Sequence, residues 1–163
     1  MADETKTARN QMVNVDLDVL ENVLSYYIRT INMAVSRDLD DKLGGFEVAR
    51  GTGKITTLLL VDSHPGIRSS VIAQLILRDR SAMVRVIDQM EEHGLLRREA
   101  DGDDNRAQGL FITPKGAELA KRIRPIVVQQ SRDFFPDITD EEHQMLISVL
   151  GRTYRRIAGL AAE

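Results

Sequence analysis

Three side chains of the types found in a hydrolytic triad are consecutive at Asp62, Ser63 and His64. A nucleophilic triad needs a base beside the nucleophile and a carboxylate beside the base, assembled from spatial partners. Consecutive residues point apart, so this order alone does not build such a site. We interpret the triplet as a helix end and a turn, because Pro65 and Gly66 follow it.

Other residue types that could support catalysis or metal binding lack the necessary spacing. His64, His93 and His143 are far apart and do not have the spacing of metal ligands. Residues 51–56, GTGKIT, lack the first glycine and the Gly-Lys-Ser/Thr ending of a phosphate-binding loop. Cysteine is absent, which excludes thiolate chemistry, disulfides and cysteine redox sensing. The sequence predicts no catalytic residue, no metal and no cofactor, and we do not expect an enzyme.

Arginine supplies the remaining chemistry, because its guanidinium group forms paired hydrogen bonds to guanine. Arg80 and Arg85 lie in the first part of a predicted helix, on the face opposite its apolar residues. Ser81, Ala82 and Val84 share that face, and short side chains there allow close approach to base edges. These five residues are therefore candidates for contact with DNA.

Residues 67–113 form the segment that must position these arginines, with two short helices followed by a hairpin. The first helix is expected over Ser69–Leu77. The second begins after Asp79, whose carboxylate suits an N-cap, and ends at Gly94. The apolar residues of the first helix recur at helical spacing, and those of the second mark a buried stripe. They are Val71, Ile72, Leu75 and Ile76 in the first helix, and Met83, Val86, Ile87 and Met90 in the second.

The hairpin is expected to form a wing with a charged tip. Leu95–Ala100 and Gly109–Ile112 are the predicted strands, joined by a long loop of turn-forming residues. Arg106 is the only cation in that loop and suits the negative minor groove, with Asp104 as its orienting carboxylate. The complete set of DNA-contact candidates is Ser69, Ser70, Arg80, Ser81, Ala82, Val84, Arg85, Asp104 and Arg106.

Together these motifs resemble the MarR-type winged-helix transcription regulators. The matching segments are Ile72–Leu75, Arg85–Glu91, Gly94–Arg98, Asp104–Arg106 and Leu110–Gly116. The resemblance covers nearly the whole chain and implies a regulator that binds DNA. Two positions depart from the family pattern. Asn105 stands where a second wing arginine is common, and Arg68 stands where Thr or Ser usually begins the first helix.

The expected fold is mainly α with a small β-wing, a winged helix-turn-helix with N- and C-terminal dimerisation helices. We expect one domain over 1–163, with a reading unit at 46–113 and dimerisation helices at 14–43 and 114–163. The expected helices outside the paired reading helices begin with Asp16–Lys42 and Thr52–Asp62. A third runs from Pro114, with Thr113 as its N-cap, to a break at Phe134-Phe135-Pro136, and a fourth runs from a capping box that begins at Thr139 to the chain end. Long amphipathic helices at both ends predict a homodimer.

Composition limits the class of protein further. A hydrophobic content of 42% argues against disorder for most of the chain. No run of 18 apolar residues exists and the N-terminus lacks an apolar signal region, so no membrane association and a cytoplasmic location are expected. The net charge is −3, and residues 68–106 contain seven arginines and eight acids. DNA binding must therefore depend on where the arginines point.

The resemblance also implies a ligand, because the family commonly binds small aromatic or phenolic anions. We expect a repressor released from an inverted-repeat operator by an aromatic acid or its CoA thioester. The candidate ligand contacts are Tyr26, Tyr27, Asn32, Arg37, Leu59 and His64, although Tyr26 and Tyr27 fit an ordinary core or interface equally well. Two alternatives stay open, a DNA-binding regulator without an effector and a helical protein-interaction module.

Overall fold

The computed structural model describes the backbone of residues 15–101 and 104–160, and the side chains of these residues except 52, 101 and 104–107. The chain divides into two compact units, Met1–Ala34 and Val35–Glu163, which are treated separately. Within the described residues, no helix has both the length and the apolar content needed to cross a membrane.

The first unit corrects the expectation of one continuous helix over Asp16–Lys42. A short 3-10 helix, Asp18–Asn22, precedes α2, Leu24–Lys42, and Val23 between them is extended. The side chain of Asp16 accepts a hydrogen bond from the Asp18 amide at 2.7 Å, and this local bond competes with helix formation. The Tyr27 hydroxyl donates to the Glu21 carbonyl at 3.1 Å and fixes the break.

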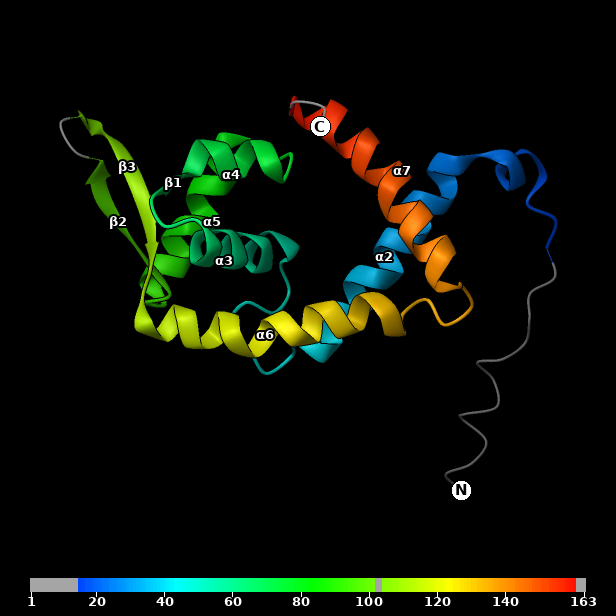
Figure 1. Cartoon of the computed structure of the whole chain (residues 1–163), viewed down its shortest axis with the longest axis horizontal. Helices are drawn as coiled ribbons and strands as arrows, with labels where there is room; N and C mark the ends of the chain where they lie inside the picture. Colours follow the sequence, from blue (N-terminus) through cyan, green and yellow to red (C-terminus); the bar gives the residue numbers. More distant parts are fainter. Residues whose placement is uncertain (1–14, 102–103, 161–163) are drawn as a thin grey trace, which may run out of the picture. The chain divides into compact units, whose positions relative to one another are not determined.

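The second unit contains the reading unit. Its elements are α3, Thr52–Ser63; β1, Ile67–Arg68; α4, Ser69–Leu75; α5, Arg80–Glu92; β2, Leu96–Asp101; and β3, Asp104–Ile112. Two short helices and a hairpin follow one another as predicted, and the β2–β3 hairpin projects away from the helices (Figure 1). The first reading helix is two residues shorter than expected, because Leu77 takes a positive φ of 55° and the Arg78 amide bonds back to the Ala73 carbonyl.

The wing is a three-stranded antiparallel sheet in the order β1-β3-β2. Strand β1 was not predicted; it pairs Ile67 with Leu110. The expected long loop at the hairpin tip is wrong, because β2 and β3 stay paired from Leu96 and Ile112 out to Asp101 and Asp104. Backbone pairing has therefore extended both strands into a stretch of polar turn formers.

Two helices, α6, Pro114–Asp133, and α7, Asp140–Ala158, complete the second unit. Both predicted N-caps are confirmed. Thr113 accepts from the Gly116 amide at 3.0 Å, and Thr139 forms a reciprocal capping box with Glu142. The approach of α6 to the wing depends on Gly116, since a β-carbon there would lie 1.9 Å from the Leu95 carbonyl oxygen.

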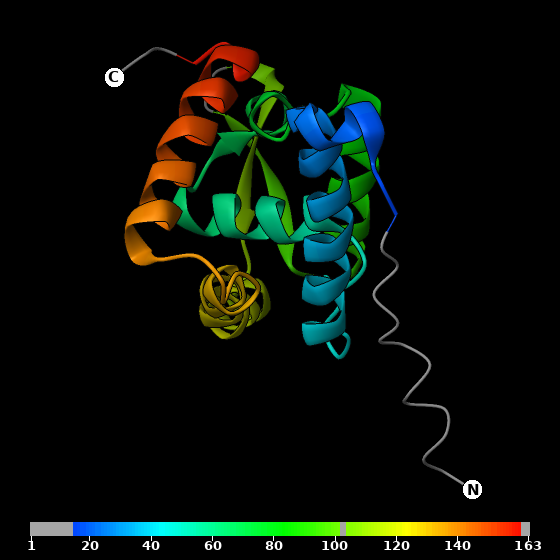
Figure 2. The ribbon, with the colours of Figure 1, turned by 90° about the vertical axis from the view of Figure 1, so that its right-hand side faces the viewer.

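The core of the second unit lies where α3, α5 and the sheet meet α6. Figure 2 views α6 end-on, with α3 crossing it. The predicted stripe of α5 is confirmed, with Met83, Val86, Ile87 and Met90 all buried. Val71 of α4, although it follows the helical spacing of the apolar residues, is 42% exposed. Each fully buried aliphatic side chain stabilises the fold by about 1.5–3 kcal/mol.

The far end of α7 returns to the reading unit. The Tyr154 hydroxyl donates to the Leu75 carbonyl and the Gln74 side-chain amide donates to the Ala158 carbonyl, both at 2.8 Å. Both acceptors are free carbonyls at helix ends, where intrahelical partners run out. The C-terminal helix is therefore hydrogen-bonded directly to the end of α4.

Candidate nucleic-acid interface and pocket

The start of α5 is fixed by a side-chain cap. The Asp79 carboxylate accepts from the Ala82 amide at 2.7 Å and from the Ser81 hydroxyl at 2.6 Å. The bond from Ser81, followed by that from Ala82, lowers the pKa of Asp79. A charged carboxylate at a helix N-terminus also suits the positive end of the helix dipole. The first turn of α5 is thus held in one orientation.

That orientation turns the predicted DNA-contact face of α5 toward solvent. Arg80, Ser81, Val84 and Arg85 are exposed and Ala82 is half-buried, while the opposite face is in the core. Among the side chains that the structure describes, Arg80 and Arg85 take part in no ion pair. Both guanidinium groups therefore remain available to an external acceptor.

Three acids of the reading unit are paired with arginines of strand β2. Arg98 pairs with Asp88 at 2.5 Å and also with Glu91, and Arg97 pairs with Glu99 at 2.6 Å. Asp88 therefore pairs within the protein. These three acids are therefore not available to pair with Arg80 or Arg85 on the exposed face of α5.

A groove joins the start of α4 to the start of α5. Its volume is about 420 Å³ and it is lined by Ser70, Val71, Ala73, Gln74, Arg78 and Arg80. The candidates Ser69 and Ser70 occupy the first turn of α4, and Ser70 lines this groove. Sequence reasoning missed Arg78, whose position in the α4–α5 turn, beside the cap residue Asp79, was the available signal.

The two wing candidates lie on β3, where only the backbone of Asp104 and Arg106 is described. Their side chains lie outside the described part of the structure. Their pairing and their entry into a minor groove accordingly stay predictions.

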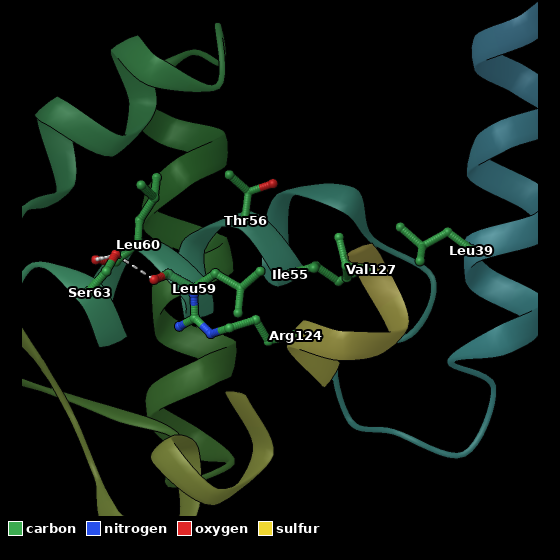
Figure 3. A pocket seen from close by; sticks show the side chains of 8 residues that line it. All are labelled: Leu39, Ile55, Thr56, Leu59, Leu60, Ser63, Arg124 and Val127. Carbon is green, nitrogen blue, oxygen red and sulfur yellow. Dashed lines mark hydrogen bonds between the residues drawn. The ribbon is translucent and has the colours of Figure 1, made fainter. Parts of the chain in front are cut away.

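A separate cavity of about 280 Å³ lies between α3, α6 and the last turns of α2 (Figure 3). It is lined by Leu39, Ile55, Thr56, Leu59, Leu60, Ser63, Arg124 and Val127. Its walls are aliphatic, and Arg124 is the one charged side chain in the lining. An apolar cavity with one cation suits an anion that carries an apolar body.

The hydrogen bonds of Asp62, Ser63 and His64, near this cavity, decide whether these three side chains form a triad. Asp62 accepts from Arg124 at 2.6 Å. The Ser63 hydroxyl donates to the Leu59 carbonyl at 2.8 Å and lies 2.9 Å from His64 Nδ1. The expectation that all three side chains point apart is thus wrong for Ser63 and His64. Because the carboxylate of Asp62 is bound to Arg124, the three do not form a triad.

Of the six predicted ligand contacts, only Leu59 lines this cavity. His64 is one hydrogen bond away through Ser63, and Arg37 is exposed on α2 outside the lining. Tyr26, Tyr27 and Asn32 belong to the first unit, where the two tyrosine rings pack edge to face at 5.4 Å. Sequence reasoning missed Arg124, because its partner Asp62 is 62 residues away and no local pattern connects them.

The helices α4 and α5 follow one another, and one face of α5 is exposed to solvent. An antiparallel wing comes next, and this arrangement is a winged helix-turn-helix. The sequence model of the MarR family matches residues 53–107, which run from α3 through most of the wing. Over this segment the chain is similar to the MarR family, and the relatives that follow are described as transcription regulators.

Individual relatives show a similarity of the same kind. A protein described as the transcriptional regulatory protein for the hcr operon of Thauera aromatica is 36% identical over 99 residues, which cover 61% of this chain and 60% of that protein. The regulator PecS of Dickeya dadantii is 25% identical over 143 residues, or 87% and 86% of the two chains. The solved structure of the repressor CouR, bound to a 23-mer DNA duplex, superposes with a TM-score of 0.76 at 23% identity, covering 86% of this chain and 99% of that one.

Proposed function

We propose that the protein is a dimeric transcription repressor that binds an inverted-repeat operator and is released from it by a small aromatic acid or its CoA thioester. The observation that carries this proposal is the exposed N-terminal half of α5, where Arg80 and Arg85 are unpaired among the described side chains. In a helix-turn-helix, this part of the second helix enters the major groove.

The roles of the contact residues follow from their chemistry. Arg80 and Arg85 would form paired hydrogen bonds to guanine, and Ser81, Ala82 and Val84 would lie against neighbouring base edges. Ser69 and Ser70 would bind phosphate at the start of α4. Arg106 would enter the minor groove beside the site, with Asp104 orienting its guanidinium group.

The exposed apolar residues of α7 support the dimer. Leu146, Val149, Leu150, Tyr154 and Ile157 recur at helical spacing and are all exposed. An apolar stripe of this length on a single chain calls for a partner. A two-fold dimer would place two α5 helices about one turn of DNA apart, which predicts half-sites centred roughly 10 bp apart.

Release by a ligand is supported by the cavity between α3 and α6, with its aliphatic walls and Arg124. The repressor role is supported by CouR, which is named a repressor and was solved with DNA. The two alternative functions differ from this proposal in what the protein would bind. A regulator without an effector would bind DNA alone, and a protein-interaction module would bind neither DNA nor acid.

The test is to sequence the genomic DNA that co-purifies with the protein, and to measure binding to the enriched sites by gel shift. We expect a recurrent inverted repeat, and the proposed function implies that the protein works at the chromosome, in the cytoplasm. Enrichment of no sequence over bulk DNA, together with no gel shift on the protein's own upstream region, would rule out an operator-binding regulator.

A further inference from the structure

The last turn of α7 is joined to the end of α4 by two hydrogen bonds that run in opposite directions. The Tyr154 hydroxyl donates to the Leu75 carbonyl, and the Gln74 side-chain amide donates to the Ala158 carbonyl, both at 2.8 Å. We propose that this clamp, formed by these four residues, sets the distance and angle between the two reading units of the dimer, and therefore the half-site spacing that the operator must have. This inference rests on the proposed function, since it concerns how the same dimer selects its DNA.

The clamp is the main attachment of α7 to the reading unit. Ala158 is the one buried residue of α7, a helix that the structure describes in full. An open cleft of about 400 Å³ lies beside the clamp and is lined by Gly53, Thr56, Leu75, Ile76, Arg78 and Tyr154. Because side chains do not fill this space, directional hydrogen bonds, more than close packing, hold the end of α7 on α4.

Two attachments fix a direction, whereas one attachment leaves a pivot. Tyr154 and Ala158 are four residues apart on α7, which places their bonds about 6 Å apart along the helix. Their partners, Gln74 and Leu75, are neighbours at the end of α4. A swing of α7 about either bond lengthens the other one. Removal of the Tyr154 hydroxyl would therefore leave a single bond, about which α7 can turn.

Tyr154 also connects the clamp to the proposed dimer surface. It belongs to the exposed apolar stripe of α7, while its hydroxyl is bonded to α4. A tyrosine side chain has only two torsions, so a partner that covers the ring also restrains the hydroxyl. The partner subunit and α4 would thus be connected through one stiff side chain.

The α4 side of the clamp leads directly to the DNA-contact face. Leu75 is the last residue of α4, and Asp79 caps α5 four residues later. The turn between them is held by the Arg78 amide, which bonds back to the Ala73 carbonyl at 2.9 Å. A shift of Leu75 would therefore move Arg80 and the first turn of α5 with it.

Half-site spacing is the property of DNA that the clamp would control. One turn of the duplex rises about 34–36 Å in about 10–10.5 bp, so one extra base pair moves a half-site by about 3.4 Å and rotates it by about 34°. A dimer with firmly held reading units rejects the displaced half-site, whereas a dimer with a pivot in each subunit can follow it. Tyr154 is thus a positioning residue, and its loss should relax the spacing preference without changing the base preference within a half-site.

The first measurement is the distance between the reading units in solution. The chain has no cysteine, so Glu92→Cys, at the exposed C-terminal end of α5, carries one spin label in each subunit. Double electron–electron resonance on the full-length dimer should give one narrow distribution of distances between the labels. Tyr154→Phe in this background should widen the distribution, because each clamp has lost one of its bonds.

The second measurement is operator affinity as a function of spacing. The probe is the inverted repeat that wild type enriches from genomic DNA, with one or two base pairs added to or removed from its centre. Wild type should bind the altered repeats more weakly than the natural one. Tyr154→Phe should reduce this discrimination by about two- to tenfold, which is the contribution of one hydrogen bond between neutral groups. Gln74→Leu, which removes the other bond, should reduce it similarly.

The matched control is Ser148→Ala. This substitution also removes a hydroxyl group from α7, but the hydrogen bond of that hydroxyl, accepted from Arg152 at 3.4 Å, stays within the helix. The variant should keep the distance distribution and the spacing preference of wild type. Analytical ultracentrifugation and thermal unfolding verify that every variant is a folded dimer.

The possible failures of the clamp and of the proposed function can be told apart. A dimeric Tyr154→Phe protein with an unchanged distance distribution, or with unchanged discrimination between spacings, would overturn the clamp alone. A wild-type dimer that binds all spacings equally would do the same. A monomeric wild-type protein, or one that enriches no inverted repeat, would instead refute the proposed function on which the clamp rests.

Discussion

At the scale of single residues, some arginines of the reading unit form ion pairs within the protein, while others are exposed and available to DNA. Arg97 and Arg98 neutralise Glu99, Asp88 and Glu91, and this leaves Arg85 available on the exposed face of α5. If Arg85 binds guanine through two hydrogen bonds, Arg85→Ala should weaken operator binding by about 1–3 kcal/mol and relax the preference at one base pair. Fluorescence anisotropy on the operator and on its single-base variants measures both effects.

The control for this substitution is Arg132→Ala, which removes an exposed arginine from α6, outside the reading unit. It should bind the operator as wild type does at the same salt concentration. Equal affinity of Arg85→Ala and wild type would remove Arg85 from the set of base contacts.

The cap residue Asp79 gives a prediction about acid stability. Its pKa in the folded protein is lowered by the hydrogen bonds from Ser81 and Ala82, while the unfolded value is near 3.8. Its contribution to the free energy of unfolding is therefore complete above about pH 3.8 and is lost as the pH falls through the lower, folded value. Asn also caps helices but does not titrate. Asp79→Asn should thus reduce the acid-side loss of stability.

The measurement is urea unfolding of wild type and Asp79→Asn at neutral pH and at values below pH 3.8. The loss should shrink but not vanish, because the pKa values of Asp38, bonded to Lys42, and of Glu141, bonded by its own backbone amide, are also lowered. Parallel stability curves for the two proteins over the whole range would show that the Asp79 cap is unimportant in acid.

What the sequence predicts at this scale is mostly local. Asp79, Thr113 and Thr139 are capping residues because their acceptors lie within three residues of the groups they cap, and all three predictions are confirmed. The Arg124–Asp62 pair depends on how α3 lies on α6, so no sequence pattern near either residue indicates it.

At the scale of elements, the junction of α6 with the wing depends on one small residue. Because a β-carbon at Gly116 would lie 1.9 Å from the Leu95 carbonyl oxygen, Gly116→Ala must push α6 away from the start of β2. Overpacking of this kind costs about 1–3 kcal/mol, and backbone atoms cannot yield as a flexible side chain does. Chemical denaturation should show that loss relative to wild type.

Gly45→Ala is the matched control, since a β-carbon there has no atom within 4 Å and its stability should change little. If Gly116→Ala and Gly45→Ala unfolded at the same denaturant concentration, close contact between α6 and β2 would not be a determinant of stability.

The elements also show which parts of the fold hydrophobic periodicity can predict and which it cannot. The stripe of α5 was predictable because thirteen residues repeat one pattern. Strand β1 has two residues, too few for any pattern, and it forms only because Ile67 finds Leu110 across the sheet. The break at Val23 was hidden because apolar spacing continues through it, while the deciding hydrogen bond comes from the side chain of Asp16.

At the scale of the whole molecule, the apolar stripe of α7 predicts the assembly. Leu150 lies in the middle of that stripe and is 50% exposed, so a charge there should leave the single chain folded. Leu150→Glu should yield a folded monomer in analytical ultracentrifugation at micromolar concentration, because burying the new carboxylate in an apolar interface is unfavourable. Operator affinity should fall with it, since only one half-site would be held at a time.

The control is Gln144→Glu, which adds the same charge to an exposed polar position of α7. It should remain a dimer. A wild-type protein that sediments as a monomer would refute both the dimer and the inverted repeat, and a dimeric Leu150→Glu would place the interface elsewhere.

The Arg98 ion pairs have a consequence for the DNA itself. Arg98 belongs to β2, while its guanidinium group binds Asp88 and Glu91 of α5, so the wing and the α5 helix are fastened together. In the proposed complex, the distance between their two points of contact is set by the protein and must be matched by the duplex. Runs of A·T pairs are stiff with a narrow minor groove, whereas pyrimidine–purine steps kink easily. Base pairs that no side chain touches would therefore be selected for how readily the double helix bends between those two points.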